Sequence, residues 1–134
     1  MYFILVYIAT YFSFAAVTPY LSLLVRGLDY SPGVVGILLG IFEGAGIGGP
    51  FLFGHFADRT GRYKPGLLVS AALVVVSAIP LVLFRSPVLS GLFLAVMAIG
   101  FRSTVPLLDA VTTVTQGKAG NYGRIRTVGS VSFI

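Results

Sequence analysis

Four long apolar segments, separated by short loops that hold most of the charged residues, limit what this chain can fold into. The segments cover about residues 2–25, 33–56, 65–84 and 88–115. A helix of about 20 apolar residues crosses the hydrocarbon core of a bilayer, which is roughly 30 Å thick. The segments therefore predict an all-α membrane protein in which four transmembrane helices pack as a bundle.

The composition excludes several classes of protein. Only 10% of the residues are charged, whereas soluble domains carry about 25%. The nine basic residues are spread over separate loops and helices, so we predict no phosphate-binding face and no nucleic-acid partner. The chain lacks cysteine, and its one histidine and four scattered acidic residues suggest no nucleophile–base set and no metal site. We therefore expect no enzymatic activity, no cofactor and no bound metal.

A fifth apolar segment covers about residues 125–134. As a helix it would reach about 15 Å, which is roughly half of a bilayer. A helix of this length cannot span the membrane. We therefore interpret the chain as a fragment, or a truncated gene product, of a larger membrane protein.

Basic residues in the loops predict how the chain is oriented, because cytoplasmic loops carry an excess of lysine and arginine. The loop at 57–64 holds three basic residues and the loop at 117–124 holds two, whereas the other two loops hold one each. We expect both of these loops and the N-terminus to lie on the cytoplasmic side of a cell membrane.

Glycine recurs at every fourth position of the second segment, at Gly36, Gly40, Gly44 and Gly48. Such a stripe of small residues allows another helix backbone to approach closely in the membrane. We expect the stripe to pack against a neighbouring helix. Sliding of that neighbour during a transport cycle is an alternative that the sequence leaves open.

Charged residues inside the membrane mark a second kind of site, because each is costly unless it is paired or hydrated. Glu43 lies near the middle of the second segment and predicts either a proton carrier or a substrate contact. An ion pair with Arg102 of the fourth segment is an equally weighted alternative. Arg102 and Asp109 are seven residues apart and therefore share one face of their helix.

Asp109 has a predicted partner on the fifth segment. The midpoint between Asp109 and Arg126 falls in the middle of the loop that joins their helices. In an antiparallel hairpin both side chains would lie about 13 Å from the turn, at the same depth. The spacing predicts an ion pair that faces an aqueous cavity, and a simple brace of the hairpin is the alternative.

The loop at 54–64 follows the pattern Gly-x-x-x-Asp-Arg-x-Gly-Arg, whose defined positions are Gly54, Asp58, Arg59, Gly61 and Arg62. This pattern resembles the loop between the second and third helices of major facilitator superfamily transporters. The resemblance implies that this loop is a conformational latch, in which Asp58 grips a neighbouring helix terminus or arginine in one state. Tyr63 departs from the family pattern, which usually has a basic residue there, and His55 falls at a variable position.

Pro106 precedes Asp109 by three residues, and an aromatic-Gly-Arg-x-Arg-x-x-Gly segment begins at Tyr122. With these features, residues 106–133 resemble the lactose permease and phenylpropionic acid permease branch of that superfamily. The resemblance implies that Asp109 and Arg126 bind the substrate. Phe133 stands where lactose permease has a tryptophan that stacks on the sugar. A sugar, an aromatic acid and a nucleoside therefore all stay open as substrates.

Together the two resemblances imply a twelve-helix secondary transporter that works by alternating access. The chain would supply part of its N-terminal six-helix bundle, namely four helices and half of the fifth. We expect proton-coupled symport of a small organic solute, with protons, the lipid bilayer and the missing C-terminal helices as partners. Drug/proton antiport and a non-functional truncated membrane fragment are the alternatives.

Overall fold

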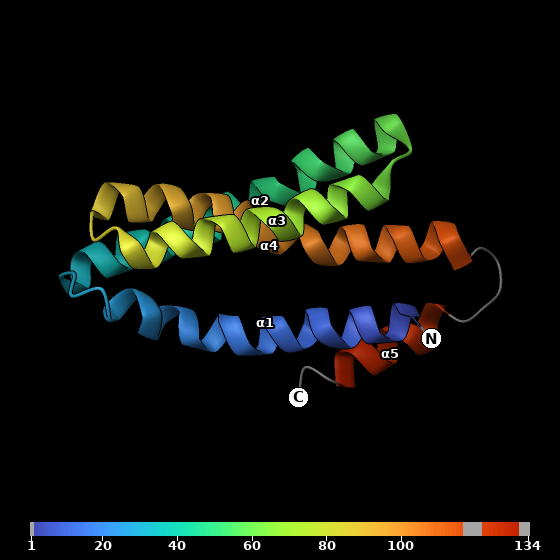
Figure 1. The fold of residues 1–134 in the computed structure, drawn as a ribbon, viewed down its shortest axis with the longest axis horizontal. Helices are drawn as coiled ribbons and strands as arrows, with labels where there is room; N and C mark the ends of the chain where they lie inside the picture. Colours follow the sequence, from blue (N-terminus) through green and yellow to red (C-terminus); the bar gives the residue numbers. More distant parts are fainter. Residues whose placement is uncertain (1, 117–121, 132–134) are drawn as a thin grey trace.

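The computed structural model describes residues 2–116 and 122–131, and these ranges fold into five α-helices (Figure 1). Each of the first four helices is long and apolar enough to cross a membrane. The helices are α1 (Tyr2–Arg26), α2 (Pro32–Thr60), α3 (Tyr63–Leu83), α4 (Pro87–Gln116) and α5 (Tyr122–Val131). The predicted all-α fold with four membrane-length helices is therefore confirmed.

The ends of two helices differ from the sequence prediction. α2 continues to Thr60, one turn beyond its apolar segment, and Gly61 then closes it in the left-handed conformation with φ of 65°. Hydropathy alone placed the end at 56, because the charged residues at 58 and 59 belong to the helix although they are not apolar. α5 begins at Tyr122 instead of 125, and the predicted part at 132–134 lies outside the described residues.

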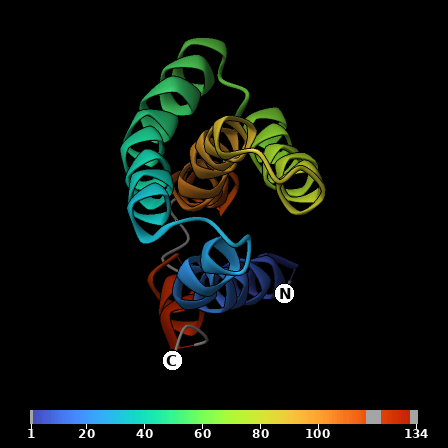
Figure 2. The same ribbon diagram turned by 90° about the vertical axis from the view of Figure 1, so that its left-hand side faces the viewer.

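α4 is the centre of the bundle and packs between α2 and α3, as Figure 2 shows from the end of the helices. Two glycines allow these close contacts. A Cβ atom at Gly49 of α2 would lie 2.5 Å from the carbonyl oxygen of Ile99, and a Cβ atom at Gly100 of α4 would lie 2.5 Å from the carbonyl oxygen of Ser70. The absence of a side chain at Gly49 and Gly100 thus brings the backbones together, which is how helices associate in lipid.

The glycine stripe of α2 does not make this contact in the described chain. Apart from the nearby backbone of α2 itself, no atom of the described residues lies within 4 Å of a Cβ built at Gly36, Gly40, Gly44 or Gly48. The buried face of α2 instead includes Leu38, and a helical turn of 3.6 residues puts that face about 180° from the middle of the stripe. The stripe is therefore open within the described residues, and its packing against a further helix stays a prediction.

α1 contacts α2 and α4 and runs beside α5 (Figures 1 and 2). Near its C-terminal end, Leu21 and Val25 join the core cluster that α2 and α4 form. In its middle, the ring of Phe14 stacks on the ring of Phe101 with centroids 3.8 Å apart. Near its N-terminus, Tyr7 packs with Leu108 of α4. These contacts place the start of α1 next to the part of α4 that carries Asp109.

Candidate functional site

Three polar side chains from three helices meet beside the C-terminal half of α4. The hydroxyl of Tyr7 on α1 donates a hydrogen bond of 2.6 Å to Oδ1 of Asp109 on α4. The guanidinium Nη1 of Arg126 on α5 lies 3.8 Å from Oδ2 of the same carboxylate. We call these residues the Tyr7–Asp109–Arg126 cluster.

The three members of the cluster differ in their exposure. The Tyr7 side chain is completely buried, whereas the Asp109 side chain is 21% exposed and the Arg126 side chain is 54% exposed. The carboxylate therefore has one oxygen held by a buried donor and the other turned toward a partly exposed cation. This arrangement presents a charged pair at the surface of a membrane-length helix.

The ion pair between Asp109 and Arg126 is the contact that their equal distance from the turn predicted. Tyr7 was not predicted, although it makes the shorter of the two contacts to Asp109. α1 is rich in aromatic residues, and its sequence contains no signal that singles out position 7. Phe133, the predicted stacking residue, lies outside the described residues.

A second charged pair joins α2 and α4. The Arg102 guanidinium donates a hydrogen bond to Oε2 of Glu43, with side-chain exposures of 41% and 64% respectively. Gly46 makes room for this arginine, since a Cβ atom there would lie 2.8 Å from Cγ of Arg102. The ion pair weighed for Glu43 is therefore present, and Arg102 and Asp109 lie about two turns apart on one face of α4.

The motif loop joins α2 and α3 at the same end of the bundle as the cluster. The Tyr63 hydroxyl donates a hydrogen bond of 2.9 Å to Oδ1 of Asp58, so that the acid has a partner within its own loop. This contact uses the one position at which the loop departs from the family pattern. Gly61 is the left-handed residue that allows the turn.

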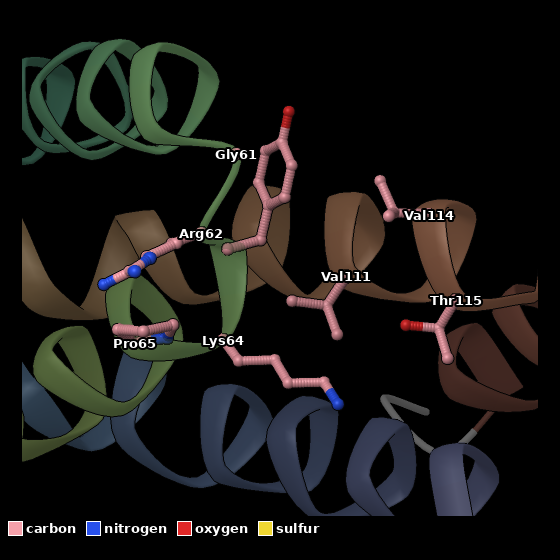
Figure 3. A pocket seen from close by; sticks show the side chains of 8 residues that line it. Gly61, Arg62, Lys64, Pro65, Val111, Val114 and Thr115 are labelled. Carbon is pink, nitrogen blue, oxygen red and sulfur yellow. The ribbon is translucent and has the colours of Figure 1, made fainter.

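A pocket of about 270 Å³ lies between this loop and the C-terminal part of α4 (Figure 3). Arg62 and Lys64 supply charge, and Val111 and Val114 supply an apolar wall. In Figure 3 the Lys64 side chain runs in the direction of Thr115, whereas the Arg62 side chain points the opposite way. The two cations therefore do not converge on one point of the pocket.

Comparison with known proteins agrees with these features. A model of the MFS_1 like family matches residues 2–134. The probable 3-phenylpropionic acid transporter of Escherichia coli (strain K12) is 31% identical over 136 aligned positions, which cover 96% of this chain and 34% of the relative. The chain thus spans about a third of the length of this curated relative. No solved structure matches the chain significantly. Because the family match runs from residue 2 to residue 134, the chain belongs to the MFS_1 like family of the major facilitator superfamily and is a multi-pass membrane protein.

Proposed function

We propose that this chain is part of the N-terminal six-helix bundle of a twelve-helix secondary transporter, and that it supplies one half of the substrate site. Such proteins bind substrate between two six-helix halves and alternate between two openings. The Tyr7–Asp109–Arg126 cluster is the observation that supports this proposal. A charged group within a membrane-length helix usually faces the bundle interior or a hydrated pathway and marks the route of a substrate or ion.

An aromatic acid is the substrate class that fits the cluster best. The guanidinium of Arg126 is more than half exposed and has the planar fork that suits a carboxylate. The relative from Escherichia coli is named as a probable transporter of 3-phenylpropionic acid, a carboxylate with one aromatic ring. Arg126 would bind the carboxylate and Asp109 would orient the arginine. Phe133 is the proposed contact for the ring.

Uptake by vesicles tests the proposal. We would reconstitute the full-length protein that contains this chain and offer labelled 3-phenylpropionate, a disaccharide and a nucleoside under an inward proton gradient. We expect accumulation of the aromatic acid, together with alkalinisation outside the vesicle when no gradient is imposed. Vesicles without the protein measure passive diffusion of the neutral acid. No protein-dependent movement of any solute would refute the proposal.

The motif loop leaves a second candidate open, which is drug/proton antiport. The pattern at 54–64 occurs in exporters as well as in uptake systems, whereas the pattern at 106–133 favours uptake. Export of a cationic dye, without transport of the acids, sugars or nucleosides, would favour the antiporter and remove the substrate role from Asp109 and Arg126.

The motif loop itself is proposed to be the conformational latch of this transporter. Asp58 would exchange its hydrogen bond from Tyr63 for a partner on another helix when the transporter changes state. Gly61 would shape the turn, and Arg59 and Arg62 would stay at the cytoplasmic interface. We propose that this loop and the N-terminus face the cytoplasm of the cell. Their basic residues then follow the positive-inside rule.

Replacement of Glu43 by glutamine is expected to separate proton coupling from substrate binding. If Glu43 carries the proton, the variant loses uphill accumulation but still exchanges labelled for unlabelled substrate at nearly the normal rate. Arg102 would hold the Glu43 carboxylate in place, because the two groups are hydrogen-bonded. Comparison of uphill uptake with exchange in the same vesicles checks this. Normal uphill uptake by the glutamine variant would contradict a proton role and leave the pair as a helix contact.

A further inference from the structure

We propose that Tyr7 is a positioning residue of the substrate site. It holds the Asp109 carboxylate by one oxygen, so that the guanidinium of Arg126 can turn to an anionic group of the substrate. This inference rests on the proposed function and extends the substrate site to α1.

The two contacts of the Asp109 carboxylate differ in length. The Tyr7 hydroxyl lies 2.6 Å from Oδ1, which is a short hydrogen bond to a carboxylate. The Arg126 nitrogen lies 3.8 Å from Oδ2, which is beyond hydrogen-bond distance although within the range of an ion pair. Tyr7 therefore makes the closer contact with the Asp109 carboxylate, and the contact of Arg126 with this carboxylate is the longer of the two.

Tyr7 itself is fixed. Its side chain is completely buried and packs with the buried Leu108, the neighbour of Asp109 in α4. The ring of Tyr7 also stacks with the ring of Tyr11, with centroids 6.2 Å apart. A phenol that cannot move holds its hydroxyl at one place, and such support keeps the groups of a site in a productive arrangement.

Binding of an anionic substrate would change the pairing of Asp109 with Arg126. A carboxylate that binds Arg126 competes with Asp109 for the same guanidinium. Asp109 is only 21% exposed, so loss of its cation without another donor would leave a largely buried charge poorly satisfied. The hydrogen bond from Tyr7 remains in place during this exchange. It lowers the cost of releasing Arg126 to the substrate.

A phenylalanine at position 7 tests this inference, because it removes only the hydroxyl and keeps the ring. In vesicles with the full-length protein, we expect Tyr7→Phe to raise the KM for 3-phenylpropionate by about tenfold, the usual size of losing one hydrogen bond to a charged group. The maximal rate should change little. Tyr11→Phe is the matched control, since it removes the same atom one turn along the same helix, and its KM should stay near that of the parent.

A double-variant cycle separates positioning from a packing role. In a protein that already carries Asp109→Asn, Tyr7→Phe should change KM no further, since the charge that it positions is gone. An equal tenfold loss in both backgrounds would overturn the inference and make Tyr7 a packing residue. An unchanged KM for Tyr7→Phe in the parent would also overturn it.

These results are distinguishable from failure of the proposed function. If Asp109→Asn and Arg126→Ala leave uptake unchanged, the cluster is not a substrate site and both proposals fall. If those two variants impair uptake but Tyr7→Phe does not, only the role of Tyr7 is lost.

Discussion

Replacement of Arg126 by alanine is expected to reduce the apparent affinity for a carboxylate substrate by about 10- to 100-fold. A hydrogen bond to a charged group contributes about 1.5–3 kcal/mol, and each 1.4 kcal/mol corresponds to about a factor of ten. The arginine offers more than one donor, so the upper part of this range is expected if both carboxylate oxygens are bound. The KM for labelled 3-phenylpropionate in vesicles measures the effect.

Two further variants sharpen this prediction. Arg126→Lys keeps the charge but loses the planar pair of donors, so its KM should lie between the values of the parent and the alanine variant. Arg85→Ala is the control, because Arg85 makes a largely exposed ion pair with Asp29 at the opposite end of the bundle. If Arg126→Ala is present in the membrane in normal amounts and its KM equals that of the parent, Arg126 does not bind the substrate.

Asp109→Asn should impair transport by a different route. The amide keeps the shape of the side chain and can still accept a hydrogen bond from Tyr7, but it no longer compensates the charge of Arg126. The guanidinium then loses the anion that orients it. We expect a loss of transport close to that of Arg126→Ala, and a double variant that is little worse than either single variant, since the two residues act as one unit.

The fold was largely predictable from hydropathy, and the exceptions have a physical cause. Membrane-length helices follow from apolar segments because the bilayer requires every backbone group to be hydrogen-bonded internally. The end of α2 was less predictable. Asp58 and Arg59 extend that helix toward the water phase, where hydropathy no longer decides whether a residue is helical.

The site was predictable only where chain connectivity determines its geometry. Asp109 and Arg126 lie on adjacent antiparallel helices, so an equal distance from the turn is enough to place them together. Tyr7 is 102 residues away from Asp109, and its depth relative to α4 depends on how the whole bundle packs. No rule of spacing relates these two positions.

The glycine stripe also shows that spacing within one helix does not identify the residues that pack against it. A regular spacing of four indicates that one face of α2 is smooth, but it does not say which helix lies against that face. The close contacts of α2 with α4 depend instead on Gly46 and Gly49, which break the regular spacing, and the close contact of α4 with α3 depends on Gly100. These three glycines differ from the stripe because atoms of a neighbouring helix lie close to them. The sequence of one helix does not determine which of its positions a neighbouring helix approaches.

Replacing glycine by alanine is therefore expected to change the free energy of unfolding in opposite directions at glycines that contact a neighbouring backbone and at glycines that do not. Gly100→Ala is expected to lower the free energy of unfolding by about 1–3 kcal/mol, because the added methyl group would lie 2.5 Å from the carbonyl oxygen of Ser70 and 3.0 Å from Cβ of Leu73. The backbones of α3 and α4 would have to separate to admit it. Gly49→Ala should behave similarly, since its added methyl group would meet the backbone of Ile99.

Gly40→Ala is the matched control and should not destabilise the chain. Outside the nearby α2 backbone, no atom of the described part of the chain lies within 4 Å of the added methyl group. Only the helix preference of alanine over glycine therefore remains, and it favours folding by about 0.5–1 kcal/mol. Thermal unfolding of the purified 134-residue chain in detergent, followed by the loss of helical circular dichroism, compares the three variants. A melting temperature for Gly100→Ala that equals or exceeds that of Gly40→Ala would show that close approach at Gly100 does not hold α3 and α4 together. A lower melting temperature for Gly100→Ala than for Gly40→Ala would show that a few backbone contacts of α4 stabilise the bundle. These contacts lie at glycines that the regular stripe does not include.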